Sequence, residues 1–66
     1  MKQTKDVYIL YNKVEKEFLG WEEDLVGDML DAKYFDGMDL VNRESMTLDE
    51  PENFEIWEIE ITYRTK

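Results

Sequence analysis

The clearest alternation of apolar and polar residues lies near the end of the chain. From residue 57 onward the odd positions are apolar or aromatic and the even positions are polar, in the order Trp57, Glu58, Ile59, Glu60, Ile61, Thr62, Tyr63 and Arg64. Because successive side chains of a strand point to opposite faces, this pattern predicts a strand with one buried and one solvated face. Phe54 and Ile56 have the opposite parity. We therefore expect either a β-bulge near residue 56 or a strand start that is covered on both faces.

Two shorter apolar runs in the first third of the chain predict a β-hairpin. Residues Val7 to Tyr11 are β-branched, aliphatic or aromatic, and Phe18 to Trp21 form a second run. The polar interval between them is short enough to join antiparallel neighbours, and Asn12 is a typical residue to open the turn. Since apolar residues fall on both faces of the first run, we expect it to be a central strand.

The middle of the chain predicts one or two short helices. Residues 22–24 are acidic and could charge the N-terminus of a helix in which Leu25, Met29 and Leu30 recur at helical spacing. Gly27 would keep that helix short.

A second helix is predicted from Asp36 to about Met46. The Asp36 side chain would accept a hydrogen bond from the backbone N–H of Asp39, and Met38 and Val41 would face the sheet. Residues 47–53 contain a proline and are predicted to form a polar loop.

Together these elements predict a single α+β domain over residues 1–66. Its sheet is small, three-stranded and mostly antiparallel, in the order β-β-α-β, with one or two short helices packed on one face. The expected core residues are Val7, Ile9, Phe18, Met38, Val41, Trp57, Ile59 and Ile61. Because so small a core offsets the conformational entropy of folding only narrowly, a homodimer or a larger partner that completes the core fits this composition.

The residue types that are absent restrict the chemistry. Cysteine and histidine do not occur in the 66 residues. The chain therefore has no disulfide and no thiolate nucleophile, and it lacks histidine, the commonest general base. The acids between residues 22 and 31 lack the spacing of a calcium loop, and paired carboxylates would need a cleft to hydrolyse a glycoside. We expect no enzyme, no cofactor and no metal site.

The apolar run at residues 7–11 is much shorter than a signal peptide core or a membrane span. We therefore expect a cytoplasmic protein that does not insert into a membrane.

The charge of the chain is strongly asymmetric. The 66 residues carry a net charge of −9, and residues 22–60 hold fourteen acids against Lys33 and Arg43, a net of −12. A small body with this charge repels nucleic acids and anionic membranes and attracts basic surfaces. The expected partner is thus a protein with a basic surface, and direct binding of nucleic acid is not expected.

Two groups of acids are candidates for contact with such a partner. Glu58 and Glu60, with Glu55 nearby, would line up carboxylates on a strand much as a nucleic acid lines up phosphates, and could block a protein that binds DNA through Arg and Lys. The second group is Glu22, Glu23 and Asp24. The ordinary alternative is that these acids only keep the surface soluble.

Aromatic residues are too numerous for this core to hide completely. Tyr11 and Tyr34 are candidate anchors for a protein partner, whereas Trp57 is expected in the core. An alternative function follows from these residues: a small structural or assembly module that pairs through an aromatic face with its own copy or with another protein.

Three segments of the chain carry a family resemblance. They are Tyr8-Ile9-Leu10-Tyr11-Asn12, Phe18-Leu19-Gly20-Trp21 and Ala32-Lys33-Tyr34-Phe35-Asp36. Over roughly residues 7 to 42 the chain resembles short proteins of bacteriophages and prophages of Gram-positive bacteria, some of which are acidic inhibitors of host defence, including anti-CRISPR proteins. The resemblance implies a bacterial host and no functional residue. We therefore expect a non-enzymatic accessory protein that binds a protein partner, most concretely an inhibitor of a nucleic-acid-binding host defence protein.

Overall fold

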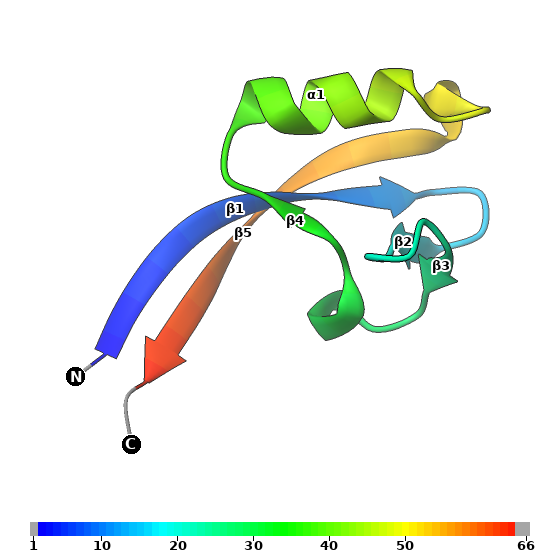
Figure 1. Cartoon of the computed structure of the whole chain (residues 1–66). Coiled ribbons are helices and arrows are strands. Elements are labelled where there is room, and N and C mark those ends of the chain that lie inside the picture. Colours follow the sequence, from blue (N-terminus) through cyan, green and yellow to red (C-terminus); the bar gives the residue numbers. More distant parts are fainter. Residues whose placement is uncertain (1, 65–66) are drawn as a thin grey trace.

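The computed structural model describes residues 2–64, which form one α-helix and five strands. The strands are β1 (Lys2–Asn12), β2 (Glu17–Leu19), β3 (Leu25–Val26), β4 (Tyr34–Phe35) and β5 (Phe54–Arg64) (Figure 1). The helix is α1 (Met38–Met46), and the short 3₁₀ turns are η1 (Met29–Asp31) and η2 (Pro51–Asn53). The predicted α+β class is confirmed.

Strand β1 is the centre of the sheet. It pairs antiparallel with β5 along its whole length, from Lys2 with Arg64 to Asn12 with Phe54. Because β5 occupies one edge of β1 throughout, β4 and β2 must share the other edge, where they pair antiparallel at residues 8–9 and 11–12. β3 extends the sheet beyond β2. The predicted count of three strands is therefore wrong, although the central position of residues 7–11 is confirmed.

The ladder between β1 and β5 runs without a bulge. From one pair of Cα partners to the next, both strands advance by one residue, so neither strand contains an extra residue. The change of apolar parity at residues 56 and 57 therefore has the other predicted cause, a strand start that is covered on both faces. Ile56 belongs to one core cluster and Trp57 to another.

The two clusters lie on opposite faces of the sheet. Buried Ile9, Phe18 and Ala32 form the first, with partly buried Tyr11, Val26, Trp57 and Ile59 around them. Buried Leu10, Leu19 and Val41 form the second, beneath helix α1. Leu10 is completely buried, as is Val41. Met38, which was predicted in the core, is 45% exposed, because it is the first residue of the helix and belongs to neither core cluster.

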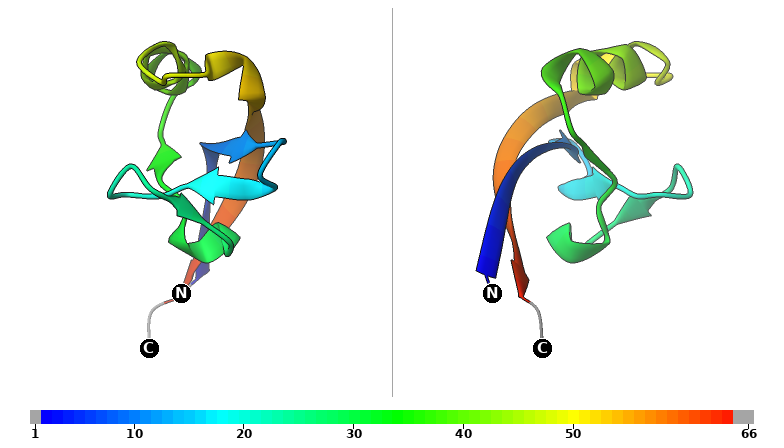
Figure 2. Two further views of the ribbon diagram at one scale, coloured as in Figure 1. Left: turned by 90° about the vertical axis from the view of Figure 1, so that its right-hand side faces the viewer. Right: turned by 60° about the vertical axis from the view of Figure 1, so that its left-hand side comes forward.

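Figures 1 and 2 show β1 and β5 curving together, with the halves nearest the termini projecting away from helix α1. We call this projecting part, residues 2–6 and 60–64, the terminal ribbon. All side chains of residues 2–6 are exposed, so the terminal ribbon is held mainly by its own strand pairing.

The predicted hairpin and its turn are confirmed. Asn12 opens the turn between β1 and β2, and its Oδ1 accepts hydrogen bonds from the backbone N–H groups of Val14 at 3.0 Å and Glu15 at 2.9 Å. Lys16 closes the turn in the left-handed region, with φ 59°. Asn12 is itself buried, so these bonds satisfy a side chain that water does not reach.

The helix predicted around Leu25, Met29 and Leu30 is wrong. Leu25 and Val26 instead form β3, and the residues from Met29 make only the short turn η1, which Asp28 caps through its side chain at 2.9 Å to Leu30 N. Three apolar residues at helical spacing are weak support when a glycine separates them.

Helix α1 ends at Met46 as predicted, but its start differs in detail. The N-cap residue is Gly37 and no side chain caps the helix. Asp36 does not accept from Asp39, because its carboxylate forms an ion pair with Lys5 of β1. Within residues 2–64, no helix has the length and apolar character needed to cross a membrane.

Candidate functional site

The three acids of β5 lie on two different faces of the sheet. Glu55 shares the face of Trp57, and its Oε1 accepts a hydrogen bond from Trp57 Nε1 at 3.0 Å. Glu58 and Glu60 lie on the opposite face, because side chains alternate along a strand that has no bulge. β5 thus presents two acids on one face and not the row of three that was expected.

One of those two acids already has a neighbour within the protein. Glu58 is the Cα partner of Tyr8 on β1. The charge of Glu58 raises the pKa of the Tyr8 hydroxyl, and loss of solvation and a hydrogen bond to Glu58 act in the same direction. Tyr8 and Glu58 are therefore electrostatically coupled across the ladder between β1 and β5.

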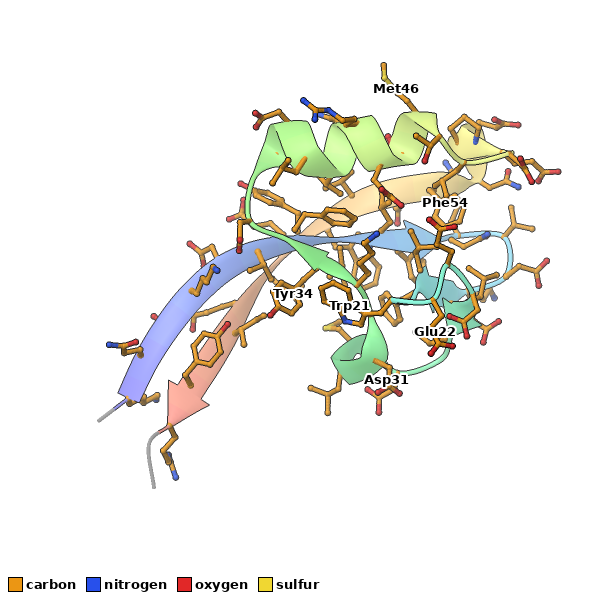
Figure 3. All side chains as sticks on the ribbon, viewed as in Figure 1. Trp21, Glu22, Asp31, Tyr34, Met46 and Phe54 are labelled. Atoms are coloured by element: carbon orange, nitrogen blue, oxygen red, sulfur yellow. The ribbon has the colours of Figure 1, made fainter. Side chains whose placement is uncertain are left out.

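The second predicted group, Glu22, Glu23 and Asp24, forms the exposed turn between β2 and β3. The backbone N–H of Gly20 donates to the carbonyl oxygen of Asp24 at 2.7 Å, which closes the turn, and Glu23 occupies the left-handed region with φ 62°. All three residues are exposed, and Figure 3 labels Glu22 beside this turn.

A second acidic segment faces this turn across a shallow groove. The groove has a volume of about 330 Å³ and brings Glu23 together with Asp49 and Glu50, which precede η2. Its apolar floor is lined by Leu19, Leu25, Leu48 and Phe54. We use the name acidic end for the three acids that line the groove together with their two neighbours in the β2–β3 turn: Glu23, Asp49 and Glu50, with Glu22 and Asp24.

The acidic end is not neutralised by ion pairs. The described residues form two such pairs, Lys5 with Asp36 and Lys33 with Glu44, and neither involves the acidic end. The adjacent β1–β2 turn carries Lys13, whose backbone N–H donates to Asn53. The side chains of the acidic end are exposed, so their charge acts directly on solvent and on any molecule that approaches.

The two predicted aromatic anchors have different surroundings. Tyr11 is half-buried, stacks on Trp57 with ring centroids 4.4 Å apart and also packs on Phe18. It belongs to the first core cluster and presents little surface to a partner. Tyr34 is 37% exposed and meets the edge of Trp21 with centroids 5.1 Å apart (Figure 3).

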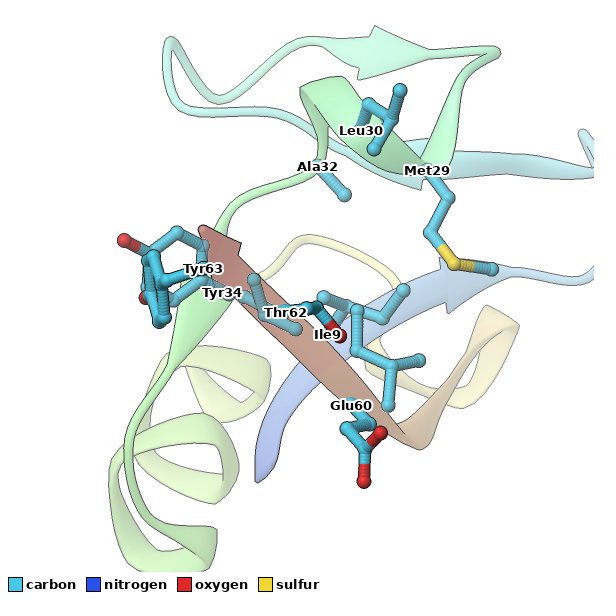
Figure 4. Close-up of a pocket in the computed structure, with 10 residues that line it drawn as sticks. Ile9, Met29, Leu30, Ala32, Tyr34, Glu60, Thr62 and Tyr63 are labelled. Atoms are coloured by element: carbon cyan, nitrogen blue, oxygen red, sulfur yellow. The ribbon is translucent and has the colours of Figure 1, made fainter. Parts of the chain in front are cut away.

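Tyr34 also borders a second groove, which we call the apolar groove. It has a volume of about 340 Å³ and lies between β5 and η1. Figure 4 shows Met29 and Leu30 on one side, with Tyr34 and Tyr63 at one end and Glu60 at the other. Its β5 side is formed by Ile59 and Ile61. Most of the lining is apolar, with Glu60 and Thr62 at its border, so the groove suits packing against another apolar surface.

Sequence reasoning missed Asp49 and Glu50 as companions of Glu23. No local pattern connects residues 23 and 49, because they meet only through the packing of β2, α1 and β5. The opposite faces of Glu55 and Glu58, in contrast, could have been deduced from their odd and even positions.

Among residues 2–64, no group of three or more acidic side chains is arranged to hold a metal ion. Comparison with protein-family models, with curated proteins and with solved structures found no match to this chain.

Proposed function

We propose that this protein is a non-enzymatic accessory protein that uses its acidic end to bind a basic surface on another protein. The observation that carries this proposal is that Glu23 of one acidic turn meets Asp49 and Glu50 of a distant segment at one groove, and no ion pair among residues 2–64 involves these acids. Carboxylates gathered in this way attract Lys- and Arg-rich surfaces and accelerate encounter with them.

The basic surfaces that fit best are those that bind nucleic acids. Such surfaces are built to contact closely spaced phosphates, and an array of carboxylates competes with phosphates for the same cations. The resemblance to short phage and prophage proteins is consistent with an inhibitor of a host defence or DNA-processing protein in the bacterial cytoplasm. The groove between the acids would add apolar contact through Leu25 and Phe54.

A pull-down of bacterial proteins with the tagged protein tests the proposal. We expect capture of a nucleic-acid-binding protein that is released by high salt and also by added DNA or RNA. Salt screens the attraction between the acids and the basic surface, and DNA or RNA competes with the acids for the Lys and Arg side chains of the partner. Capture that neither salt nor nucleic acid reverses would contradict the proposal.

Two matched triple variants then locate the surface. Glu22→Lys, Glu23→Lys and Asp49→Lys reverse three charges at the acidic end, whereas Glu55→Lys, Glu58→Lys and Glu60→Lys make the same change of net charge on β5. We expect at least a tenfold loss of partner affinity for the first triple and a clearly smaller loss for the second. An equal loss for both would show that only net charge matters, and a larger loss for the β5 triple would move the site to β5.

A further inference from the structure

The outer edge of β5 has no partner strand among residues 2–64. β5 pairs with β1 alone, over all eleven of its residues. An edge of this length exposes a row of backbone N–H and C=O groups that can pair with another strand. Natural proteins usually protect such an edge with charges, bulges or a covering segment, and the ladder of β5 contains no bulge.

The side chains near this edge are apolar on one face. Ile59, Ile61 and Tyr63 line the apolar groove, and Leu30 on its opposite wall is 90% exposed. The free edge of β1 differs, because residues 2–6 carry only polar or charged side chains. An apolar partner would therefore bind at the edge of β5 rather than at the edge of β1.

Local charge favours a second copy of this chain as the occupant. The whole chain carries −9, whereas the terminal ribbon carries Lys2, Lys5 and Arg64 against Asp6 and Glu60, and Asp36 pairs with Lys5, so the local charge is balanced. Two copies that meet at the ribbons keep their acidic ends apart, since the acidic end lies at the other end of the sheet (Figures 1 and 3). A strongly basic partner, by contrast, would be drawn to the acidic end.

We propose that two copies pair their β5 strands antiparallel about a two-fold axis at Ile61. Opposite residues then have numbers that add to 122, so Ile61 faces its own copy and Glu58 faces Arg64 of the second copy. Ile59 meets Tyr63 of the second copy on the groove face, and Glu60 meets Thr62 on the other face. Every apolar residue meets an apolar one, and the acid at each end meets a base.

Neighbouring registers are less favourable. An axis at residue 60 places Glu60 opposite its own copy, and an axis at residue 59 places Glu58 opposite Glu60. A register in which the numbers of opposite residues add to 121 or 123 is excluded. It would put the apolar face of one copy beside the acidic face of the other. With the axis at Ile61, Tyr63 of the second copy extends over Ile59 and the apolar groove, which gives the groove a cover.

The absence of cysteine from the chain permits a direct test. In the proposed dimer an Ile61→Cys variant places two thiols on directly opposite residues, within the Cα separation that a disulfide requires. A Tyr63→Cys variant is the matched control. Residue 63 of one copy faces residue 59 of the other, so the two introduced cysteines would lie four residues apart along the strand, about 13 Å from each other. Under mild oxidation we expect a covalent dimer from Ile61→Cys and little from Tyr63→Cys. Equal cross-linking of both variants, or of neither, would overturn the register.

Sedimentation of the unmodified protein and of charge variants provides a second test that does not depend on Ile61. We expect a concentration-dependent dimer that Arg64→Glu weakens at least tenfold and that the double variant Glu58→Arg with Arg64→Glu restores. Lys13→Glu is the matched control, since it changes net charge equally at the other end of the sheet. A protein that remains monomeric at all concentrations would overturn the proposal. Because salt screens the repulsion between two acidic copies, high salt should preserve the dimer while it releases the basic partner, so the two proposals fail independently.

Discussion

The indole ring of Trp57 stacks on the phenol ring of Tyr11, with centroids 4.4 Å apart and planes inclined by 28°. The two residues are diagonal neighbours across the ladder between β5 and β1, since Trp57 is the Cα partner of Ile9 and Tyr11 that of Glu55. Phe18 of β2 adds an edge contact to Trp57 at 5.5 Å. The aromatic cluster thus joins three strands of the sheet and closes the first core cluster.

Substitution of Trp57 by alanine should therefore destabilise the fold. We expect a loss of about 3 kcal/mol in the free energy of unfolding, measured with urea, because stacking, edge contacts and burial are lost together. Trp21 offers a control of the same residue type that is 55% exposed. Trp21→Ala should change the stability by less than about 1 kcal/mol. Equal effects would show that the aromatic cluster is not structural.

Two leucines make a similar comparison for the core beneath helix α1. Leu10 is 0% exposed, whereas Leu30 is 90% exposed. Leu10→Ala should cost about 2–5 kcal/mol, since it opens a cavity between the sheet and the helix, and Leu30→Ala should stay within about 0.5 kcal/mol. Thermal and urea unfolding of both variants would check this, at protein concentrations low enough to exclude association. A small loss of stability for Leu10→Ala would show that helix α1 does not pack on the sheet over Leu10.

Gly20, which follows β2, and Gly27, which follows β3, should respond in opposite ways to a methyl group. A Cβ at Gly20 would lie 2.9 Å from both Asp24 Oδ1 and Val26 Cγ1, whereas a Cβ at Gly27 meets nothing nearer than Glu17 Oε2 at 3.8 Å. Gly20→Ala should destabilise by about 1–3 kcal/mol through overpacking. Gly27→Ala should be neutral or stabilising by up to about 1 kcal/mol, because it restricts the unfolded chain. Unfolding curves that rank the two variants in reverse order would contradict the geometry of the turn.

The pairing of Tyr8 with Glu58 predicts a pH dependence in alkaline solution. The pKa of Tyr8 is raised above its ordinary value of 10.0, so the unfolded chain releases this proton at a lower pH than the folded protein does. The contribution to stability is complete below pH 10 or so, and it is lost as the pH rises through the higher pKa of the folded state. Glu58→Gln should lower the pKa of Tyr8.

An NMR titration of the Tyr8 ring in the original protein and in Glu58→Gln measures this shift. Glu60→Gln is the control, because it removes the same charge from the same face without being the cross-strand partner of Tyr8. A Tyr8 pKa that is unchanged by Glu58→Gln would refute the proposed interaction.

The parts of the fold that were predictable from the sequence are those with a sustained local pattern. The alternation after Trp57 and the stripe of α1 repeat over enough residues to define a face, and both elements occur where they were expected. The two-residue strands β3 and β4 contain no repeat, so no pattern could separate them from loops. They exist because β1 and β2 offer them free edges.

The candidate site was predictable only in part, for the same reason. The excess of acids follows from composition, but residues 22–24 were expected to begin a helix and instead form a turn, and the approach of Asp49 to Glu23 depends on contacts between distant segments. Tyr11 was a candidate anchor for a partner, and the structure packs it half-buried against the first core cluster; an aromatic residue next to a turn has the same local sequence in either position. Its role depends on Trp57, which is distant in the sequence.

The central position of β1 has a consequence for biosynthesis. β1 is translated well before its principal partner β5, which begins only at Phe54. At ribosomal rates of roughly 5–20 residues per second, several seconds pass before that partner emerges, during which Val7, Ile9 and Leu10 have only the short strands β2 and β4 against them. The nascent chain is thus most exposed to misassociation at its first strand, and a chaperone that recognises short apolar strands would meet this protein at residues 7–11.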